Sequence, residues 1–152
     1  MQLQQYRRRG FDICYLDETS TNLWDKGRYT WQHSKDKLKI IINENRGNSM
    51  TIIGAICSST SKWCYRVCDS TTANNFLDFL KEDLIPFLKN PGKTVLVMDN
   101  HQAHRAFIST GYINQETRLT TLFMPPYSSD LNPIERVWSV LKQRWRMHLI
   151  SL

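Results

Sequence analysis

Residues 94–98 read TVLVM, and Asp99 follows them directly. An apolar run of this length, without alternating polar residues, is typical of a strand that is buried on both faces of a sheet. Pro91-Gly92 breaks the chain shortly before the run. The stretch therefore predicts a central strand over Thr94–Met98 with a carboxylate at its carboxyl end.

Further segments on either side of this run also have strand character. The clearest are Phe11–Leu16 (FDICYL), Met50–Cys57 (MTIIGAIC), Trp63–Cys68 (WCYRVC) and Leu119–Met124. The second and third are close enough in the sequence to form a hairpin. Weaker strand character is found at Arg28–Gln32 and Lys37–Ile42.

Helical spacing of apolar residues marks three other segments. They cover Thr72–Leu88, with Thr71 or Thr72 as the N-cap, His104 to about Gln115, and Ile134 to about His148. Trp138 and Trp145 share one face of the last helix with Leu141, so we interpret both as core residues rather than as residues that stack on bases.

Strands that cluster first and then alternate with helices predict an α/β fold, with a mixed central sheet flanked by helices. The length of 152 residues suits a single domain over residues 1–152.

The charge balance is basic, with twenty Lys and Arg against fourteen Asp and Glu and a net charge of +6. This excess favours a polyanionic partner such as nucleic acid, because Lys and Arg that neutralise phosphates release condensed counterions. Arg7, Arg8 and Arg9 could serve as a solvated chain end, a phosphate contact or a nuclear address. No apolar run approaches the length of a membrane span and no signal peptide is visible, so we expect an intracellular protein without membrane contact.

The four cysteines show neither a CxxC pair nor a histidine at zinc-finger spacing. Cys14 and Cys57 lie inside apolar runs, where free thiols usually act as small buried apolar residues. We therefore expect reduced cysteines, as in an intracellular protein.

Three acids occupy positions at which a divalent cation could bind. Asp17 follows the first strand, Asp99 follows the central strand, and Glu135 lies in the first turn of the last helix. Sites in sheets of this kind form beyond the carboxyl ends of adjacent strands, so Asp17 and Asp99 could lie side by side. A hard cation relieves the repulsion between such carboxylates, and Mg²⁺ also accepts waters and phosphate oxygens as ligands. Two ions about 3.5–4 Å apart can hold the attacking and leaving oxygens of an in-line displacement.

Each acid also has a structural alternative. Asp17 could form a turn or cap a helix, and Asp99 could open the helix that follows it. Asn132 as the N-cap, with Pro133 at the first helical position, would place Glu135 third, where a capping box requires Glu.

Three neighbouring residues, taken from the sequence alone, leave the assignment of the site residues open. Glu18 is an alternative to Asp17 and points to the opposite face of the same strand. His101 and His104 could contact phosphate or act as acid or base, and the alternative for both is a structural role near a helix start.

Three blocks of sequence resemble the catalytic domain of mariner-like transposases and their bacterial insertion-sequence relatives. The blocks are YLDETS (Tyr15–Ser20), VLVMDNHQAH (Val95–His104) and MPPYSSDLNPIERVWSVLKQRW (Met124–Trp145), and GRYTW (Gly27–Trp31) is similar to a stretch that follows the first block. They come in the order of the family and span nearly the whole chain, and the last is highly specific. Thirty-five residues lie between Asp99 and Glu135, close to the usual interval of the family.

The resemblance implies a ribonuclease-H-like fold in which Asp17, Asp99 and Glu135 are the catalytic triad and hold two Mg²⁺ or Mn²⁺ ions. It selects Asp17 over Glu18. It implies a DDE endonuclease that hydrolyses a phosphodiester at transposon ends and then uses the freed 3′-hydroxyl to attack target DNA. The implied partners are DNA and a second copy of the chain, as a homodimer in a synaptic complex. The implied location is the nucleus in a eukaryote, or the cytoplasm and nucleoid in a bacterium.

The resemblance also implies DNA contacts by basic residues near both ends of the chain and by one histidine. These residues are Arg7, Arg8, Arg9, His104, Lys142, Arg144 and Arg146. Relatives carry helix-turn-helix modules before the catalytic domain, and the first catalytic strand begins close to Met1 here, so we expect that N-terminal region to be absent.

Two alternative functions remain. One is a ribonuclease-H-like nuclease for other nucleic acids, against which the block Leu131–Glu135 argues. The other is a non-catalytic transposase remnant that binds DNA or full-length transposase.

Overall fold

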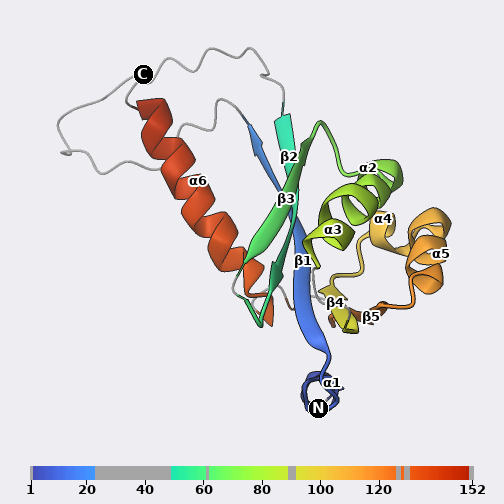
Figure 1. The fold of residues 1–152 in the computed structure, drawn as a ribbon. Helices are drawn as coiled ribbons and strands as arrows, with labels where there is room; N and C mark the ends of the chain where they lie inside the picture. The colour runs from blue at the N-terminus through green and yellow to red at the C-terminus, as the bar shows by residue number, and fades with distance from the viewer. Residues whose placement is uncertain are drawn as a thin grey trace.

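One mixed sheet forms the centre of the protein (Figure 1). The computed structural model describes residues 2–22, 49–60, 62–88, 92–125, 128 and 131–150, and within these ranges the strand order is β3-β2-β1-β4-β5. The strands are β1 (Asp12–Asn22), β2 (Ser49–Cys57), β3 (Trp63–Cys68), β4 (Thr94–Met98) and β5 (Leu119–Phe123). β1 pairs antiparallel with β2 and parallel with β4, and β2 and β3 form the predicted hairpin. The predicted α/β fold with a mixed sheet is therefore confirmed.

Helices cover both faces of this sheet (Figure 1). They are α1 (Gln2–Arg8), α2 (Ala73–Asp78), the π-helical segment η1 (Phe79–Leu84), α3 (Ile85–Phe87), α4 (Gln102–Arg105), α5 (Phe107–Gln115) and α6 (Ile134–Ile150). α6 lies on one face, and α2 to α5 lie on the other side of the sheet. No helix in the described ranges is both long and apolar enough to cross a membrane. The weak strands predicted at 28–32 and 37–42 lie outside the described residues.

β1 is longer than the sequence predicts, and this changes the position of Asp17. The predicted strand ends at Leu16, whereas β1 continues to Asn22 because its antiparallel ladder with β2 extends to the pair Asn22–Ser49. The parallel ladder with β4 stops earlier, at the pair Tyr15–Val97. Asp17 therefore lies within a strand and not at its end, but it lies just beyond the point at which the neighbouring strand β4 stops. The same parallel register, continued by two residues, brings Asp17 level with Asp99.

Alternation along β1 divides its side chains between two cores. Cys14 and Leu16 belong to the core beneath α2, η1 and α5. Ile13 and Tyr15 belong to the core on the other face, against which residues of α1 pack. By the same alternation Asp17 faces the α6 side of the sheet, and Glu18 faces the side of α2 and α4.

The helix predicted over 72–88 is confirmed, with a local change of period. Thr72 is its N-cap, and the Thr72 hydroxyl accepts a hydrogen bond from the Asn75 amide. The turns widen to π-helical geometry at Phe79–Leu84, which ends two positions before Pro86. Proline has no amide hydrogen and its ring displaces the preceding turn, so a wider turn is an effective way to accommodate it.

Two helical boundaries differ from the prediction. The helix expected from His104 is divided into α4 and α5, because Ala106 has an extended backbone conformation between them. α1 is not predicted at all from its short, polar sequence. It ends at Arg8 and is followed by a Schellman-type turn, in which the Gly10 and Phe11 amides donate to the carbonyls of Arg7 and Tyr6 respectively. Gly10 has a φ of 78°, which is accessible to glycine.

The expectation that all four cysteines are free is wrong for two of them. Cys14 and Cys57 form a disulfide, whereas Cys64 and Cys68 are free thiols. Cys14 and Cys57 lie directly opposite each other in the β1–β2 ladder, with their Cα atoms 4.2 Å apart. That short separation is typical of antiparallel pairs whose side chains are closest. The two residues are 43 positions apart in the sequence, so their pairing becomes apparent only once the strand register is known.

Candidate active site

Asp17 is positioned by a hydrogen bond from Trp138 of α6. The Trp138 Nε1 atom lies 3.2 Å from Asp17 Oδ2. Trp138 is 2% exposed and packs with Ile52 and Ile134, so the prediction that it is a core residue is confirmed. Its second role, as the donor that orients an acid 121 residues away, was missed. The one signal in the sequence is that a buried indole N–H usually requires an acceptor.

The close packing of Trp138 depends on Gly54. Gly54 lies opposite Asp17 in the β1–β2 ladder. A Cβ atom built on Gly54 would lie 2.6 Å from the Cη2 atom of Trp138, which is closer than real Cβ atoms approach. Glycine at this position therefore allows the indole to approach β2 closely while its Nε1 reaches the carboxylate on the neighbouring strand.

The environment of Asp17 disfavours its negative charge. Burial raises the pKa of the Asp17 carboxyl from 3.8 to about 7, and the charges of Glu135 and Glu18 add to this increase. Hydrogen bonds from the Glu18 backbone and from Trp138 oppose the rise. A carboxylate that is partly buried beside a second acid is a favourable ligand for a cation, because the cation removes the repulsion between the two acids.

Glu135 is placed beside Asp17 by the start of α6. Asn132 is buried, its Oδ1 accepts from the Ile134 amide and its Nδ2 donates to the Leu16 carbonyl of β1, each at 3.4 Å. This asparagine therefore caps the helix and also attaches it to the strand that carries Asp17. No hydrogen bond joins the Glu135 side chain to the Asn132 amide, although both residues lie in the described part of the chain. The capping-box alternative for the Glu135 carboxylate is therefore not realised, and its side chain is exposed.

Asp99 is positioned by the two histidines that follow it. Its Oδ1 atom accepts a hydrogen bond from the His101 amide at 2.9 Å and lies 3.0 Å from His104 Nδ1. The other ring nitrogen of His104, Nε2, lies 2.7 Å from Glu18 Oε1. The His101 side chain accepts from the Ala103 amide at the start of α4, which is the structural role that we considered for it.

His104 is fully buried, with 0% of its side chain exposed. Burial by itself lowers the pKa of the imidazole, but the hydrogen bond and charge of Glu18, together with Asp99, raise it above its usual value. The predicted contact between His104 and DNA does not fit this position, because its ring has no access to a phosphate. No signal in the sequence pairs His104, which lies five residues after Asp99, with Glu18, which lies 86 positions earlier.

The structure thus brings the predicted acids together in part. Asp17 and Glu135 interact electrostatically, and the strand register brings Asp99 level with Asp17. Although the structure describes all three acids, their oxygens do not form a group within 4.8 Å of one another, whereas atoms of Glu18, His101 and His104 do. Joint ligation of a metal by the triad therefore stays a prediction.

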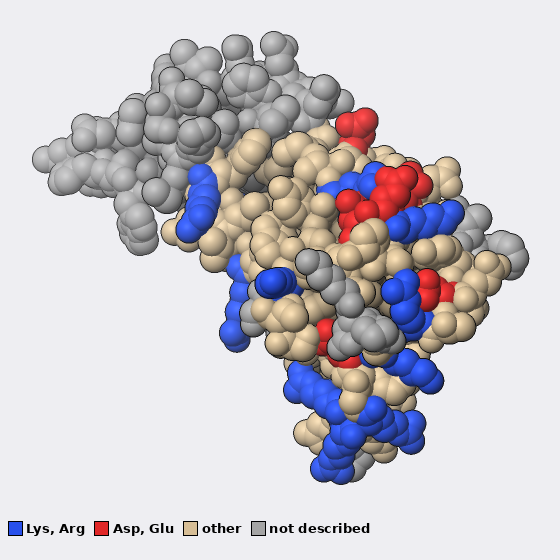
Figure 2. Space-filling view, in the orientation of Figure 1, with Lys and Arg blue, Asp and Glu red and all other residues tan. Residues whose placement is uncertain are grey.

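Predicted DNA-contacting side chains lie in two regions. Arg7 and Arg8 are in the last turn of α1 and are exposed, as is Arg9. Figure 2 shows Lys and Arg side chains gathered at this end of the molecule, at the bottom of the view. On α6, Lys142 is half-buried and Arg144 is exposed. The side chain of Arg146 lies outside the described residues.

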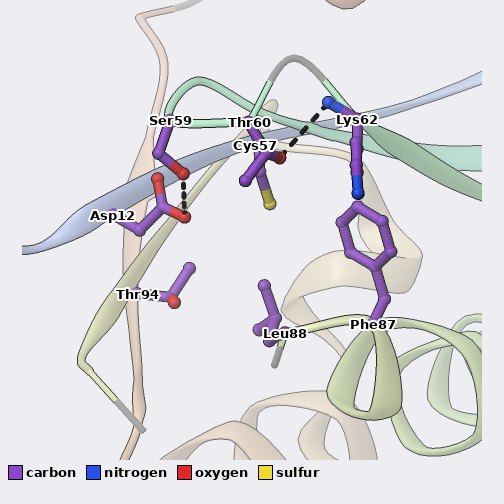
Figure 3. Close-up of a pocket in the computed structure, with 8 residues that line it drawn as sticks. All are labelled: Asp12, Cys57, Ser59, Thr60, Lys62, Phe87, Leu88 and Thr94. Carbon is purple, nitrogen blue, oxygen red and sulfur yellow. Dashed lines mark hydrogen bonds between the residues drawn. The ribbon is translucent and has the colours of Figure 1, made fainter. Parts of the chain in front are cut away.

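A second group of acid and sulfur ligands, Asp12 with Cys14 and Cys57, offers no metal site. Asp12 and Cys57 line a hollow of about 290 Å³ near the N-terminal end of β1 (Figure 3). Both sulfurs are in the disulfide. The two carboxylate oxygens of Asp12 accept hydrogen bonds from the Ile13 amide and the Ser59 hydroxyl. The groups that could ligate an ion are therefore already engaged.

Known proteins are similar to this chain in both sequence and fold. An uncharacterised 39 kDa protein of insertion element IS630 from Shigella sonnei is 24% identical over 130 residues, which are 85% of this chain and 37% of that protein. The structure of the Mos1 transposase paired-end complex with the left transposon end has a TM-score of 0.70 at 19% identity, covering 94% of this chain and 45% of that one. The Mos1 mariner paired end complex with Mn gives a TM-score of 0.71 at 18% identity, covering 95% of this chain and 46% of that one.

These similarities confirm the predicted ribonuclease-H-like fold, with its mixed sheet and flanking helices. The chain spans less than half the length of each of these three relatives. Residues 12–151 also match the family described as DDE superfamily endonuclease. Because this match covers most of the sequence, the chain belongs to the DDE superfamily endonuclease family.

Proposed function

We propose that this chain is the catalytic domain of a cut-and-paste DNA transposase, with Asp17, Asp99 and Glu135 as its acidic triad. The observation that carries the proposal is the environment of Asp17. Its carboxylate is partly buried and held by Trp138, and burial together with the nearby charge of Glu135 raises its pKa to about 7. An acid kept in such an unfavourable position is typical of a functional site.

The donor set fits two Mg²⁺ or Mn²⁺ ions. All three proposed ligands offer carboxylate oxygens, which these hard cations prefer. When bound, the ions would neutralise charge on the scissile phosphate and on the entering and leaving oxygens. The protein itself would supply orientation: Trp138 holds Asp17, Asn132 attaches the helix of Glu135 to β1, and His104 holds Asp99.

The proposed reaction has two stages. A phosphodiester at a transposon end is hydrolysed, and the freed 3′-hydroxyl then attacks a phosphodiester of target DNA. Such phosphoryl transfers depend on positioning and on charge neutralisation rather than on a protein nucleophile. We infer DNA contacts by Arg7, Arg8 and Arg9 and by the basic residues of α6, and assembly of two chains in a synaptic complex. The protein would then act where its DNA is, in a nucleus or a nucleoid.

The proposal is tested by calorimetric titration of the purified chain with Mn²⁺. We expect saturable binding in the wild type and its loss or strong weakening in Asp17→Asn, Asp99→Asn and Glu135→Gln. Glu116→Gln is the matched control, because it makes the same change in an acid that pairs with Arg118 away from the site. Cleavage of pre-nicked transposon-end DNA, with Mg²⁺ and with each variant, then tests the reaction itself.

Three outcomes would contradict the proposal. A folded wild type that binds no Mn²⁺ would favour the non-catalytic remnant. Binding that survives all three triad variants would place the metal elsewhere in the protein. Cleavage of RNA in an RNA–DNA hybrid, without cleavage of transposon-end DNA, would favour a nuclease of the ribonuclease-H type.

A further inference from the structure

A buried histidine connects two acids that come from different elements. His104 of α4 lies between Glu18 of β1 and Asp99, which follows β4. Its Nε2 atom lies 2.7 Å from Glu18 Oε1, and its Nδ1 atom lies 3.0 Å from Asp99 Oδ1. Both ring nitrogens therefore face carboxylate oxygens. Nδ1 also forms a hydrogen bond with the backbone carbonyl of Asp99 at 3.4 Å, so the imidazole contacts both the backbone and the carboxylate of this residue.

The imidazole is held tightly in this position. Its ring packs on the fully buried Phe76 of α2, with ring centroids 4.5 Å apart, and against His101 at 5.6 Å. The side chain of His104 is 0% exposed, and that of Glu18 is 12% exposed. A ring packed in this way cannot turn away from either acid without disturbing the α2 side of the core.

Asp99 needs such support because of where it lies. It follows the last residue of β4, so no strand ladder fixes its side chain, which is 50% exposed. Its Oδ1 atom is engaged by the His101 amide and by His104. Within the described residues, no hydrogen bond or ion pair engages Oδ2. The hydrogen bond from the His101 amide and the close contact with the His104 ring thus both fall on Oδ1, which leaves Oδ2 available.

We propose that Glu18 and His104 form a relay that fixes the Asp99 carboxylate for metal binding, with Glu18 as a positioning residue that acts through His104. The inference rests on the proposed function of Asp99 as a metal ligand. It gives the two adjacent acids of β1 different tasks on opposite faces of the sheet. Asp17 faces Trp138 and serves as a ligand, whereas Glu18 faces His104 and orients a ligand on the next strand. Outer partners of this kind typically change metal affinity by about 10–100-fold when they are removed.

The experiment is a double-mutant cycle of Glu18→Gln and His104→Asn, in which the affinity for Mn²⁺ is measured for each protein. Glu18→Gln keeps the size of the side chain and an oxygen that can accept from Nε2, but it removes the charge. His104→Asn keeps a short N–H donor for Asp99, but it does not reach Glu18. We expect Glu18→Gln to weaken Mn²⁺ binding by about 10-fold in the wild-type background. The same change should have no further effect in the His104→Asn background, because the connection is already broken there.

Three further measurements make the result decisive. Thermal melts establish that each variant is folded, and Glu116→Gln is the matched control, for which Mn²⁺ affinity should be unchanged. Burial protects a proton on His104 Nδ1 from exchange with solvent, which makes its NMR resonance observable. If Asp99 binds the metal, this resonance should shift in the wild type when Mg²⁺ is added. This last measurement requires no variant and therefore remains informative if a substitution impairs folding.

The outcomes separate this inference from the proposed function. If wild type binds Mn²⁺ and Asp99→Asn does not, but Glu18→Gln binds as well as wild type, the relay is overturned and the proposed function stands. An equal effect of Glu18→Gln in both backgrounds also overturns the relay, because Glu18 would then act independently of His104. Absence of Mn²⁺ binding in the wild type overturns the proposed function, and the relay with it.

Discussion

The indole of Trp138 occupies the space that a side chain on Gly54 would need. A Cβ atom at position 54 would lie 2.6 Å from Trp138 Cη2 and 3.2 Å from Cζ2. These atoms belong to a rigid ring that is 2% exposed, so the ring cannot yield locally as the end of a flexible side chain would. The same ring donates to Asp17, and the packing of position 54 is therefore coupled to the orientation of a proposed metal ligand.

Gly54→Ala should destabilise the protein and weaken Mn²⁺ binding together. Overpacking of this kind costs about 1–3 kcal/mol, and displacement of the ring removes Nε1 from Asp17. Thermal melts and Mn²⁺ calorimetry measure the two effects. The control is Gly111→Ala in α5, where a Cβ atom would meet nothing within 4 Å and should stabilise the helix by about 0.5–1 kcal/mol. A Gly54→Ala protein with the melting temperature of the wild type would contradict the close contact.

Trp138→Phe isolates the hydrogen bond from the packing. Phenylalanine retains much of the buried ring but has no N–H for Asp17, so Mn²⁺ affinity should fall by about 10-fold. Trp145→Phe, on the same helix, is the matched control because Trp145 Nε1 is buried without a hydrogen-bond partner among the described residues. Its Mn²⁺ affinity should equal that of the wild type. Equal losses in the two variants would show that the indole N–H of Trp138 has no special role.

Asp17→Asn should change how the stability of the metal-free protein depends on pH. The pKa of Asp17 is about 7 in the folded state, above its ordinary 3.8, so the folded state binds this proton more tightly than the unfolded state does. The contribution of Asp17 to stability therefore declines as the pH rises from about 4 to about 7 and is constant above that. In EDTA at pH 8, Asp17→Asn should melt at a higher temperature than wild type, and the difference should shrink toward pH 4.

Asp78→Asn, at an exposed position at the end of α2, is the control for this comparison. Its difference from the wild type should be small at every pH. If the advantage of Asp17→Asn were the same at pH 5 and pH 8, the unfavourable burial of the Asp17 charge would not be the cause.

Asn132→Ala should lower stability, whereas Glu135→Gln should not. The first change removes a helix cap, which is worth about 1 kcal/mol, and also the connection from α6 to the Leu16 carbonyl. The second removes a charge that disfavours ionised Asp17 from an exposed side chain, so it should weaken Mn²⁺ binding at a melting temperature no lower than that of the wild type. Asn114→Ala, exposed on α5, controls for the loss of an amide and should stay within about 0.5 kcal/mol of wild type. A lower melting temperature in Glu135→Gln would restore the capping role of this acid.

The sequence was sufficient for the elements whose signal is local. The apolar run of β4 predicts Thr94–Met98, which are the bounds observed, and the hairpin of β2 and β3 also follows from its pattern. The polar end of β1 carries no apolar alternation, and its strand pairing is with β2 beyond the end of the ladder with β4, so the sequence underestimates its extent. α1 was missed because a seven-residue helix that buries no residue completely has little periodic signal.

The contacts around the candidate site could not be predicted in the same way. They join residues far apart in the chain, such as Trp138 with Asp17 and His104 with Glu18. Each depends on the strand register and on which face of β1 a residue occupies, and neither is determined by composition or spacing. The resemblance selected Asp17 over Glu18, but it did not indicate that Glu18 has a partner of its own.

The disulfide between Cys14 and Cys57 helps to keep Asp17 and Glu18 in their different roles on opposite faces of the sheet. If β1 shifted by one residue against β2, every side chain of β1 would exchange faces: Glu18 would come to lie under the indole and Asp17 would turn toward the imidazole. A covalent bond between directly opposed residues forbids that shift. The disulfide lies only three residues before Asp17. It therefore fixes the strand register at this point and keeps Asp17 and Glu18 on their respective faces of the sheet.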